Sequence, residues 1–139
     1  MPMLRIRYWF LFLTLFSSSS FATITHLRIG APEDFACAHQ AFFAELSRQH
    51  QYRVEVKILP FKDVVEALNA NKIHVSAHGI TSINVFAPGN EAVPSKPYKE
   101  DQVYWVSKKK KRLLDNINQL LEKVGNPYRY YQDNGTCEA

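Results

Sequence analysis

Hydrophobic residues recur with two different periods along the chain, and each period predicts one type of secondary structure. The apolar segment 27–29 ends at Gly30 and predicts a first strand. Apolar side chains at helical spacing predict an amphipathic helix over 35–49. Glu33 or Asp34 precedes this helix and is expected to cap it, because acidic side chains are favoured near the positive N-terminal end.

The rest of the pattern continues this alternation. Apolar and charged residues alternate over 52–59, which predicts a strand whose buried face carries Val54, Val56 and Ile58. The following elements are expected to be a helix, a strand, an irregular connection, a strand and a helix, over residues 61–69, 73–80, 81–96, 102–107 and 113–124. Strands that alternate with helices predict an α/β fold, a mainly parallel sheet flanked by helices. In such sheets ligands bind at the carboxyl ends of the strands.

The N-terminal residues have the pattern of a segment that directs export. Arg5 and Arg7 precede the uncharged run 8–16, and Ser20 and Ala22 are small residues at the two positions that a signal peptidase reads. The run is shorter than the roughly 20 residues that span a bilayer. We therefore interpret 1–22 as a cleaved signal peptide and 23–139 as one mature domain in the periplasm. An uncleaved membrane anchor is the alternative.

Composition and charge exclude several classes of protein. The 139 residues are 46% hydrophobic and 22% charged, which excludes a disordered chain. The formal charge is +4, and it falls to +2 once the two arginines of the signal segment are removed, since that segment contains no acid. A charge this small argues against a nucleic-acid-binding protein.

Two cysteines remain after export, in a compartment that permits disulfides. Cys37 and Cys137 would close a loop of 100 residues, which in the chain-entropy account stabilises by up to about 4 to 5 kcal/mol. The sequence leaves open whether they are bridged.

From His26 to Lys108 the chain resembles the periplasmic solute-binding proteins of the amino-acid type, family 3. Three segments carry the resemblance: the opening strand Leu-Arg-Ile-Gly at 27–30, the strand–helix–strand segment 54–81, and Ser-Lys-Pro-Tyr at 95–98 followed by the strand at 104–108. The same domain forms the non-catalytic part of certain membrane-bound lytic transglycosylases. Family members have two lobes, and this chain resembles a single-lobe or truncated form, in which 109–135 is similar to the closing helix and tail of the family.

The resemblance implies a binding protein without catalysis or cofactor, which holds a small polar solute and delivers it to an ABC transporter of the inner membrane. Topology and resemblance together place six ligand-binding candidates after the first, second and third strands: Asp34, Phe35, Phe61, Gly79, Thr81 and Ser82. The alternative for these positions is that Phe61 belongs to the core and that Thr81 and Ser82 are turn residues. One departure stands out, because 83–86 has neither the Thr nor the Arg that grips a ligand carboxylate in family members.

The remaining chemistry in the sequence is sparse. His74 and His78 lie on one face of a predicted strand, and with His39 or Asp34 they would make an incomplete metal site, so no metal is predicted. No nucleophile motif or paired-carboxylate signature is present. Five consecutive cations at 108–112 precede the last predicted helix, and at this end they oppose the helix dipole. Two interpretations of this run are open: a solvated loop, or a contact with anionic lipid or glycan. The alternative function is a ligand-free module that binds an envelope protein.

Overall fold

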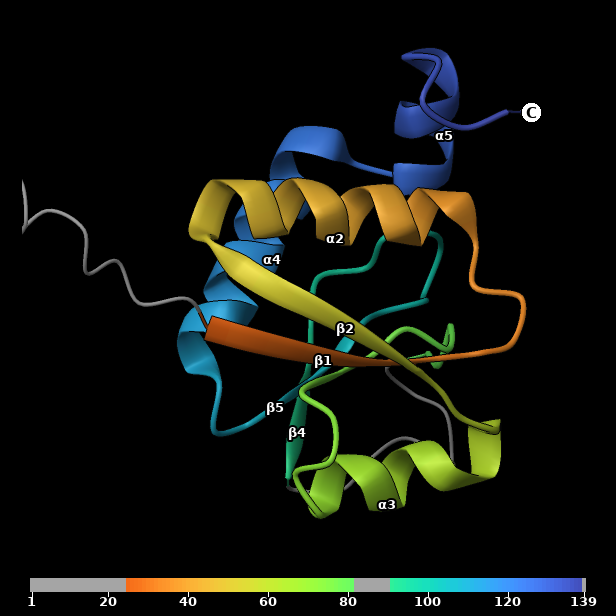
Figure 1. Ribbon diagram of the computed structural model, residues 1–139. Helices are drawn as coiled ribbons and strands as arrows, with labels where there is room; N and C mark the ends of the chain where they lie inside the picture. The colour runs from red at the N-terminus through yellow and green to blue at the C-terminus, as the bar shows by residue number, and fades with distance from the viewer. Residues whose placement is uncertain (1–24, 82–90, 139) are drawn as a thin grey trace, which may run out of the picture.

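The computed structural model describes residues 25–81 and 91–138, so the predicted signal peptide lies outside the described residues. A five-stranded sheet in the order β2-β1-β3-β5-β4 forms the centre of the molecule, with helices on both of its faces (Figure 1). The strands are β1 (Thr25–Ala31), β2 (Tyr52–Ile58), β3 (Val75–Ser76), β4 (Ala92–Pro94) and β5 (Trp105–Ser107). The α/β class with flanking helices is as predicted.

The sheet is parallel on one side and antiparallel on the other. β1 pairs in parallel with β2 over its whole length, from Thr25 opposite Tyr52 to Ala31 opposite Ile58, and also with β3. β5 is antiparallel to both β3 and β4. β4 lies in a segment that the sequence predicted to be irregular, since three residues are too few to show an alternating pattern. The predicted strands at 73–80 and 102–107 are correspondingly shorter in the structure.

The helices cover the two faces of the sheet unequally. α2 (Cys37–His50), α4 (Lys111–Val124) and α5 (Pro127–Asp133) lie on one face, and α3 (Val64–Asn69), preceded by the short helix η1 (Phe61–Asp63), lies on the other (Figure 1). Ala36 occupies the N-cap position of α2 without a side-chain hydrogen bond, so the predicted cap by Glu33 or Asp34 is wrong. α5 begins with an Asn126 cap and Pro127, a start signal that the sequence analysis did not use.

Two apolar clusters form the core. The larger cluster lies between the sheet and the face with α2 and α4, and includes Ile29, Phe42, Leu46, Tyr104 and Ile117. The smaller cluster lies under α3 and is formed by residues such as Val64, Leu68, Ile73, Ile80 and Trp105. The helical stripes of the sequence therefore face the sheet, and each of these large side chains contributes on the order of 2 to 3 kcal/mol by leaving water.

β2 is an edge strand, and its apolar face is more exposed than its alternating pattern predicted. Val56 is 40% exposed and Ile58 is 55% exposed. The side chains on this face line an open groove of about 1130 Å³ beside α2, together with Phe43 and Phe35 of the α2 segment. The prediction of a half-buried strand is therefore wrong at its C-terminal end, because none of the elements described in 25–81 and 91–138 covers the outer side of the strand there.

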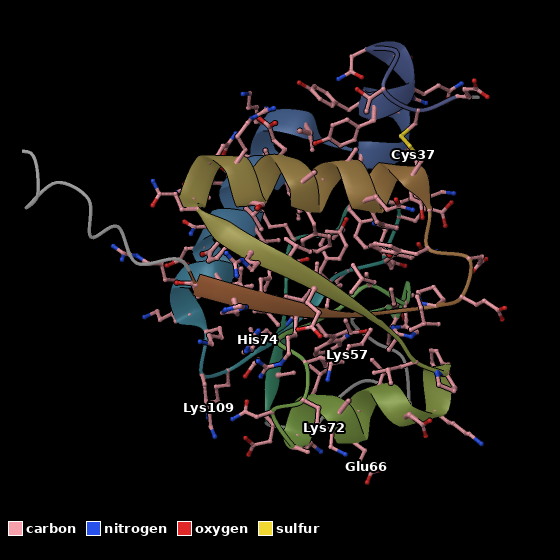
Figure 2. The ribbon with its side chains drawn as sticks, in the orientation of Figure 1. Cys37, Lys57, Glu66, Lys72, His74 and Lys109 are labelled. Atoms are coloured by element: carbon pink, nitrogen blue, oxygen red, sulfur yellow. A yellow bond between two sulfur atoms is a disulfide. The ribbon has the colours of Figure 1, made fainter. Side chains whose placement is uncertain are left out.

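A disulfide joins the start of α2 to the segment after α5. Cys37 and Cys137 are bonded, with their Cα atoms 5.9 Å apart, and the bridge is visible at the end of α2 (Figure 2). It attaches the C-terminal segment to the domain across 100 residues of sequence. Within the described ranges, no helix is both long and apolar enough to cross a bilayer.

Candidate functional site

The carboxyl ends of β1, β2 and β3 carry five of the six residues that the sequence proposed for ligand binding. Asp34 is exposed in the turn after β1, and Phe35 is half-buried beside it. Phe61 follows β2 at the start of η1 and is 43% exposed. Gly79 and Thr81 follow β3 and are half-buried, whereas Ser82 lies outside the described residues.

His39, in the first turns of α2, is the centre of an aromatic cluster at this edge of the sheet. Its side chain is 4% exposed, and its two ring nitrogens share hydrogen bonds with two tyrosines, Nδ1 with the Tyr104 hydroxyl and Nε2 with the Tyr128 hydroxyl, both at 2.7 Å. The Phe35 ring stacks on the imidazole, with a centroid distance of 6.1 Å and an interplanar angle of 9°. Burial lowers the pKa of His39 to about 4, so the ring is neutral at physiological pH.

Tyr98 brings a polar atom without a partner to this cluster. Its ring stacks on Tyr104 at 4.6 Å and meets the edge of His39 at 4.8 Å. Its hydroxyl is buried and has no hydrogen-bond partner among the described residues. Burial, and secondarily the nearby Tyr128, raises the pKa of this phenol well above its usual range, so it stays a neutral donor. A buried hydroxyl without a partner costs roughly 1 to 3 kcal/mol. Among the described residues, the Tyr131 hydroxyl and the Trp105 Nε1 are buried without a partner in the same way.

Gly79 lies next to the Tyr98 hydroxyl. A side-chain carbon on Gly79 would lie 3.6 Å from the Tyr98 hydroxyl and 3.4 Å from Oε1 of Gln102. The backbone of Gly79 has a φ of +72°, a conformation that favours glycine. Thr81 forms an isolated antiparallel bridge with Gln102, which ties the segment after β3 to the segment before β5.

Two opposite charges, those of Lys99 and Asp34, act on Tyr128 at the rim of the cluster. The Lys99 Nζ lies 4.9 Å from the centre of the Tyr128 ring. Burial raises the pKa of Tyr128, and the negative charge of Asp34 raises it further. The rim therefore presents an ammonium, a carboxylate and an aromatic ring in one place.

His78 connects the ends of β2 and β3 instead of facing the cluster. Its Nε2–H donates to the Leu59 carbonyl at 2.9 Å, and its Nδ1 lies 3.2 Å from the Ser76 hydroxyl, which donates to it. Burial lowers the pKa of this ring. In the described part of the chain, no three His, Cys, Asp or Glu side chains gather in a way that would hold a metal ion.

The structure therefore brings some of the proposed residues together and adds others. Phe35 and Gly79 are linked through His39 and Tyr98, and Thr81 joins them through Gln102. Four residues of this edge were not predicted to bind ligand: His39, Tyr98, Lys99 and Tyr128. Of these, only Tyr98 could have been identified from a sequence motif, because it belongs to Ser-Lys-Pro-Tyr at 95–98. Tyr128 is brought in by α5, some 90 residues away along the chain from His39, and no local pattern reveals it.

Comparison with known proteins identifies the fold. No family model and no curated protein matches the sequence. Among solved structures, the arginine-bound form of domain 1 from TmArgBP of T. maritima is 21% identical, with a TM-score of 0.59 over 70% of this chain and 92% of that chain. The probable amino-acid ABC transporter extracellular-binding protein ytmK from Bacillus subtilis is 9% identical, with a TM-score of 0.64 over 80% and 98%.

A third similar structure is that of a binding protein from which an enzyme descends. The ancestral amino-acid-binding protein AncCDT-1, a precursor of cyclohexadienyl dehydratase, is 11% identical, with a TM-score of 0.59 over 78% of this chain and 94% of that chain. At these identities the similarity shows a shared fold. That fold is the α/β lobe of amino-acid-type solute-binding proteins, as the resemblance implied.

Proposed function

We propose that this protein binds a small zwitterionic solute of the amino-acid type at the carboxyl ends of β1 and β3. The observation that carries the proposal is the rim of Tyr128, where the Lys99 ammonium lies over the aromatic ring and the negative charge of Asp34 acts on the phenol. A ligand with both an ammonium and a carboxylate complements these two charges. Its apolar part would rest on the aromatic surface of Phe35 and Phe61.

The unpaired hydroxyl of Tyr98 supports a polar ligand at this edge. A buried donor without a partner is costly in the free protein, and the cost is removed when a ligand atom accepts its hydrogen bond. Lys99 takes the role of carboxylate partner in this proposal, since the Thr and Arg that serve this purpose in family members are absent from 83–86. Gly79 lies beside this hydroxyl, since a side-chain carbon at that position would lie 3.6 Å from it.

A single lobe suffices for binding in a protein of the same fold. Domain 1 of TmArgBP was crystallised in an arginine-bound form, and the present chain matches most of that domain. One lobe buries less of a ligand than two closing lobes, so we expect a weaker affinity here than in a two-lobed protein. A dissociation constant on the order of 10 μM to 1 mM corresponds to about 4 to 7 kcal/mol of binding free energy.

The wider role follows from the same relatives. We infer that the protein is exported to the periplasm, that it binds without chemical conversion of its ligand, and that it presents the ligand to an inner-membrane ABC transporter. The extracellular-binding protein ytmK supports the location and the transporter, and the predicted signal peptide at 1–22 agrees with them. The AncCDT-1 comparison makes catalysis worth testing, because a fold of this kind lies on the lineage of an enzyme.

Calorimetric titration with chemically matched ligands tests the proposal. Arginine and glutamine carry both charges of the zwitterion, and agmatine lacks the carboxylate of arginine. We expect arginine and glutamine to bind, and agmatine to bind at least ten-fold more weakly than arginine. The difference corresponds to the loss of one charge-assisted hydrogen bond between the ligand carboxylate and Lys99. Lys99→Gln should abolish the preference for arginine over agmatine, and Asp34→Asn should weaken both.

The exposed Glu66 on α3 provides a matched control, since Glu66→Gln removes a charge on the opposite face of the sheet. The proposed site would be contradicted if arginine and agmatine bound with equal affinity, or if Glu66→Gln lowered the affinity as much as Asp34→Asn. Saturable binding of none of these ligands would favour the alternative function, an envelope-protein-binding module without a small ligand.

A further inference from the structure

A small basic pocket lies at the opposite edge of the sheet from the candidate ligand site. It has a volume of about 210 Å³ and is lined at the N-terminus of α4 by Lys109, Lys110, Lys111 and Arg112. Its other walls come from the amino ends of β1 and β2 and from His74, which precedes β3. None of the described residues that line this pocket is acidic. Figure 2 shows His74 and Lys109 at this end of the molecule, away from Cys37.

The start of α4 is electrostatically unfavourable without a ligand. The 14-residue helix has Lys110 at its N-cap with no side-chain hydrogen bond, and its first turn contains no acid. Its first backbone N–H groups point outward, since the Leu114 N–H is the one that bonds back to the Lys110 carbonyl. Cations at this end oppose the helix dipole and repel one another. Both described ion pairs, Arg48–Glu45 and Lys96–Glu122, lie elsewhere.

His74 supplies an independent donor toward this pocket. Its side chain is only 6% exposed, and its Nδ1 accepts a hydrogen bond from the backbone N–H of Arg28 at 2.9 Å. Because Nδ1 is an acceptor there, the neutral ring carries its proton on Nε2. That Nε2–H has no hydrogen-bond partner in the described part of the chain, and the ring lines the pocket. Burial, then the positive charges of Arg28 and Lys110, lower the pKa of His74 to about 4, so the donor persists as neutral imidazole.

The orientation of this donor is held by the surrounding structure. The Arg28 guanidinium donates to the carbonyls of Lys72 and Asn71, at 2.9 and 2.8 Å, and these carbonyls belong to the segment that leads into His74. The backbone of His74 is bonded on both sides, its N–H to the Arg28 carbonyl and its carbonyl to the Ser107 N–H. A neutral donor is thus fixed next to four cations and a free helix N-terminus.

We propose that this pocket binds a phosphate group. Helix N–H groups, lysine ammonium groups and a neutral imidazole N–H are the donors that a tetrahedral oxyanion accepts, and the pocket volume admits such a group. The bound anion would satisfy the His74 donor, complement the dipole of α4 and neutralise the repulsion within 109–112. The phosphate belongs either to a small soluble molecule or to the headgroup of an anionic lipid.

Titration with inorganic phosphate tests the pocket directly. At constant ionic strength, we expect saturable shifts of the Lys111, Arg112 and Leu113 amide resonances and of the His74 Nε2–H, with a dissociation constant on the order of millimolar. The double substitution Lys109→Gln and Lys110→Gln should raise this constant by about ten-fold or more. Lys123→Gln removes one lysine charge at the exposed C-terminal end of α4 and serves as the control for loss of charge outside the pocket.

A second arm distinguishes the sources of the phosphate. Vesicles of phosphatidylcholine with and without phosphatidylglycerol are sedimented with the wild type and with both variants. Sedimentation with the anionic vesicles that is lost in the double variant and kept in Lys123→Gln identifies a lipid headgroup, whereas the phosphate-induced shifts without sedimentation identify a soluble ligand. Unchanged amide resonances together with no specific sedimentation would overturn the proposal, and so would equal effects of the double variant and the control. The arginine titration above is independent of each of these results.

Discussion

Replacing Tyr98 with phenylalanine separates the binding role of this residue from its packing role. The substitution removes one oxygen atom and keeps the ring that stacks on Tyr104 and meets His39. The lost hydroxyl is buried and has no partner among the described residues, so its removal takes away a desolvation penalty and no hydrogen bond. Penalties of this kind are roughly 1 to 3 kcal/mol, and partial relaxation leaves an expected gain of about 1 to 2 kcal/mol.

The gain in stability translates into a measurable shift in melting temperature. For a domain of this size the entropy of unfolding gives roughly 4 °C per kcal/mol, so Tyr98→Phe should melt about 4 to 8 °C higher than the wild type without ligand. The same substitution should weaken arginine binding by about five- to ten-fold, because the ligand loses one hydrogen bond worth roughly 1 kcal/mol. Thermal unfolding followed by circular dichroism and calorimetric titration measure the two effects.

The opposite signs of these two effects make the prediction stringent. Tyr130→Phe removes the same atom from a half-buried tyrosine on α5 outside the cluster, and should change neither quantity. A lower melting temperature for Tyr98→Phe would show that the hydroxyl has a stabilising partner in the free protein. An unchanged affinity for arginine would show that the hydroxyl does not face the ligand. Either result would refute the reasoning that connects this buried donor to binding.

Three further predictions concern the stability of the fold. Replacing Cys37 and Cys137 with serine should lower the free energy of unfolding by up to about 4 to 5 kcal/mol, because the bridge closes a loop of 100 residues. Chemical denaturation measures this loss, and an unchanged denaturation midpoint would contradict the prediction. The pKa of His39 is about 4 in the fold and about 6.5 in the unfolded chain, which therefore takes up the proton first. The contribution of His39 to stability is therefore full above pH 6.5 and falls by about 3 kcal/mol toward pH 4. NMR titration of the ring would disprove this by showing a pKa near 6.5. Gly79→Ala should cost about 1 kcal/mol in thermal unfolding, because alanine rarely adopts a φ of +72°, and a melting temperature equal to that of the wild type would rule out this conformation.

The long, strongly periodic elements were predictable from the sequence. The stripes of α2 and α4 and the alternation in β2 are local patterns, and they led to the observed helices and strand within a few residues. Burial along β2 was not predictable in the same way. Alternation shows that the two faces of a strand differ. Val56 and Ile58 are nevertheless exposed, because β2 ends the sheet and no other described element covers its outer side.

The candidate site was predictable to the extent that topology places it. Parallel strands put their carboxyl ends at one edge, which is why Phe35 and Gly79 come close to one another through His39 and Tyr98. Contacts between distant segments were beyond the sequence, above all the approach of Tyr128 to His39. The basic run at 108–112 had been interpreted as a solvated loop or an anionic-ligand contact, and its pocket became visible only when the fold brought His74 to the start of α4.

The most direct test of the account is the calorimetric comparison of arginine with agmatine on the wild-type protein. Binding through the Asp34–Tyr128–Lys99 rim predicts saturable binding of arginine with one site per chain, at least ten-fold tighter than agmatine. Equal affinities for the two molecules, or no heat of binding for either at millimolar concentration, would contradict a zwitterion site at this edge of the sheet.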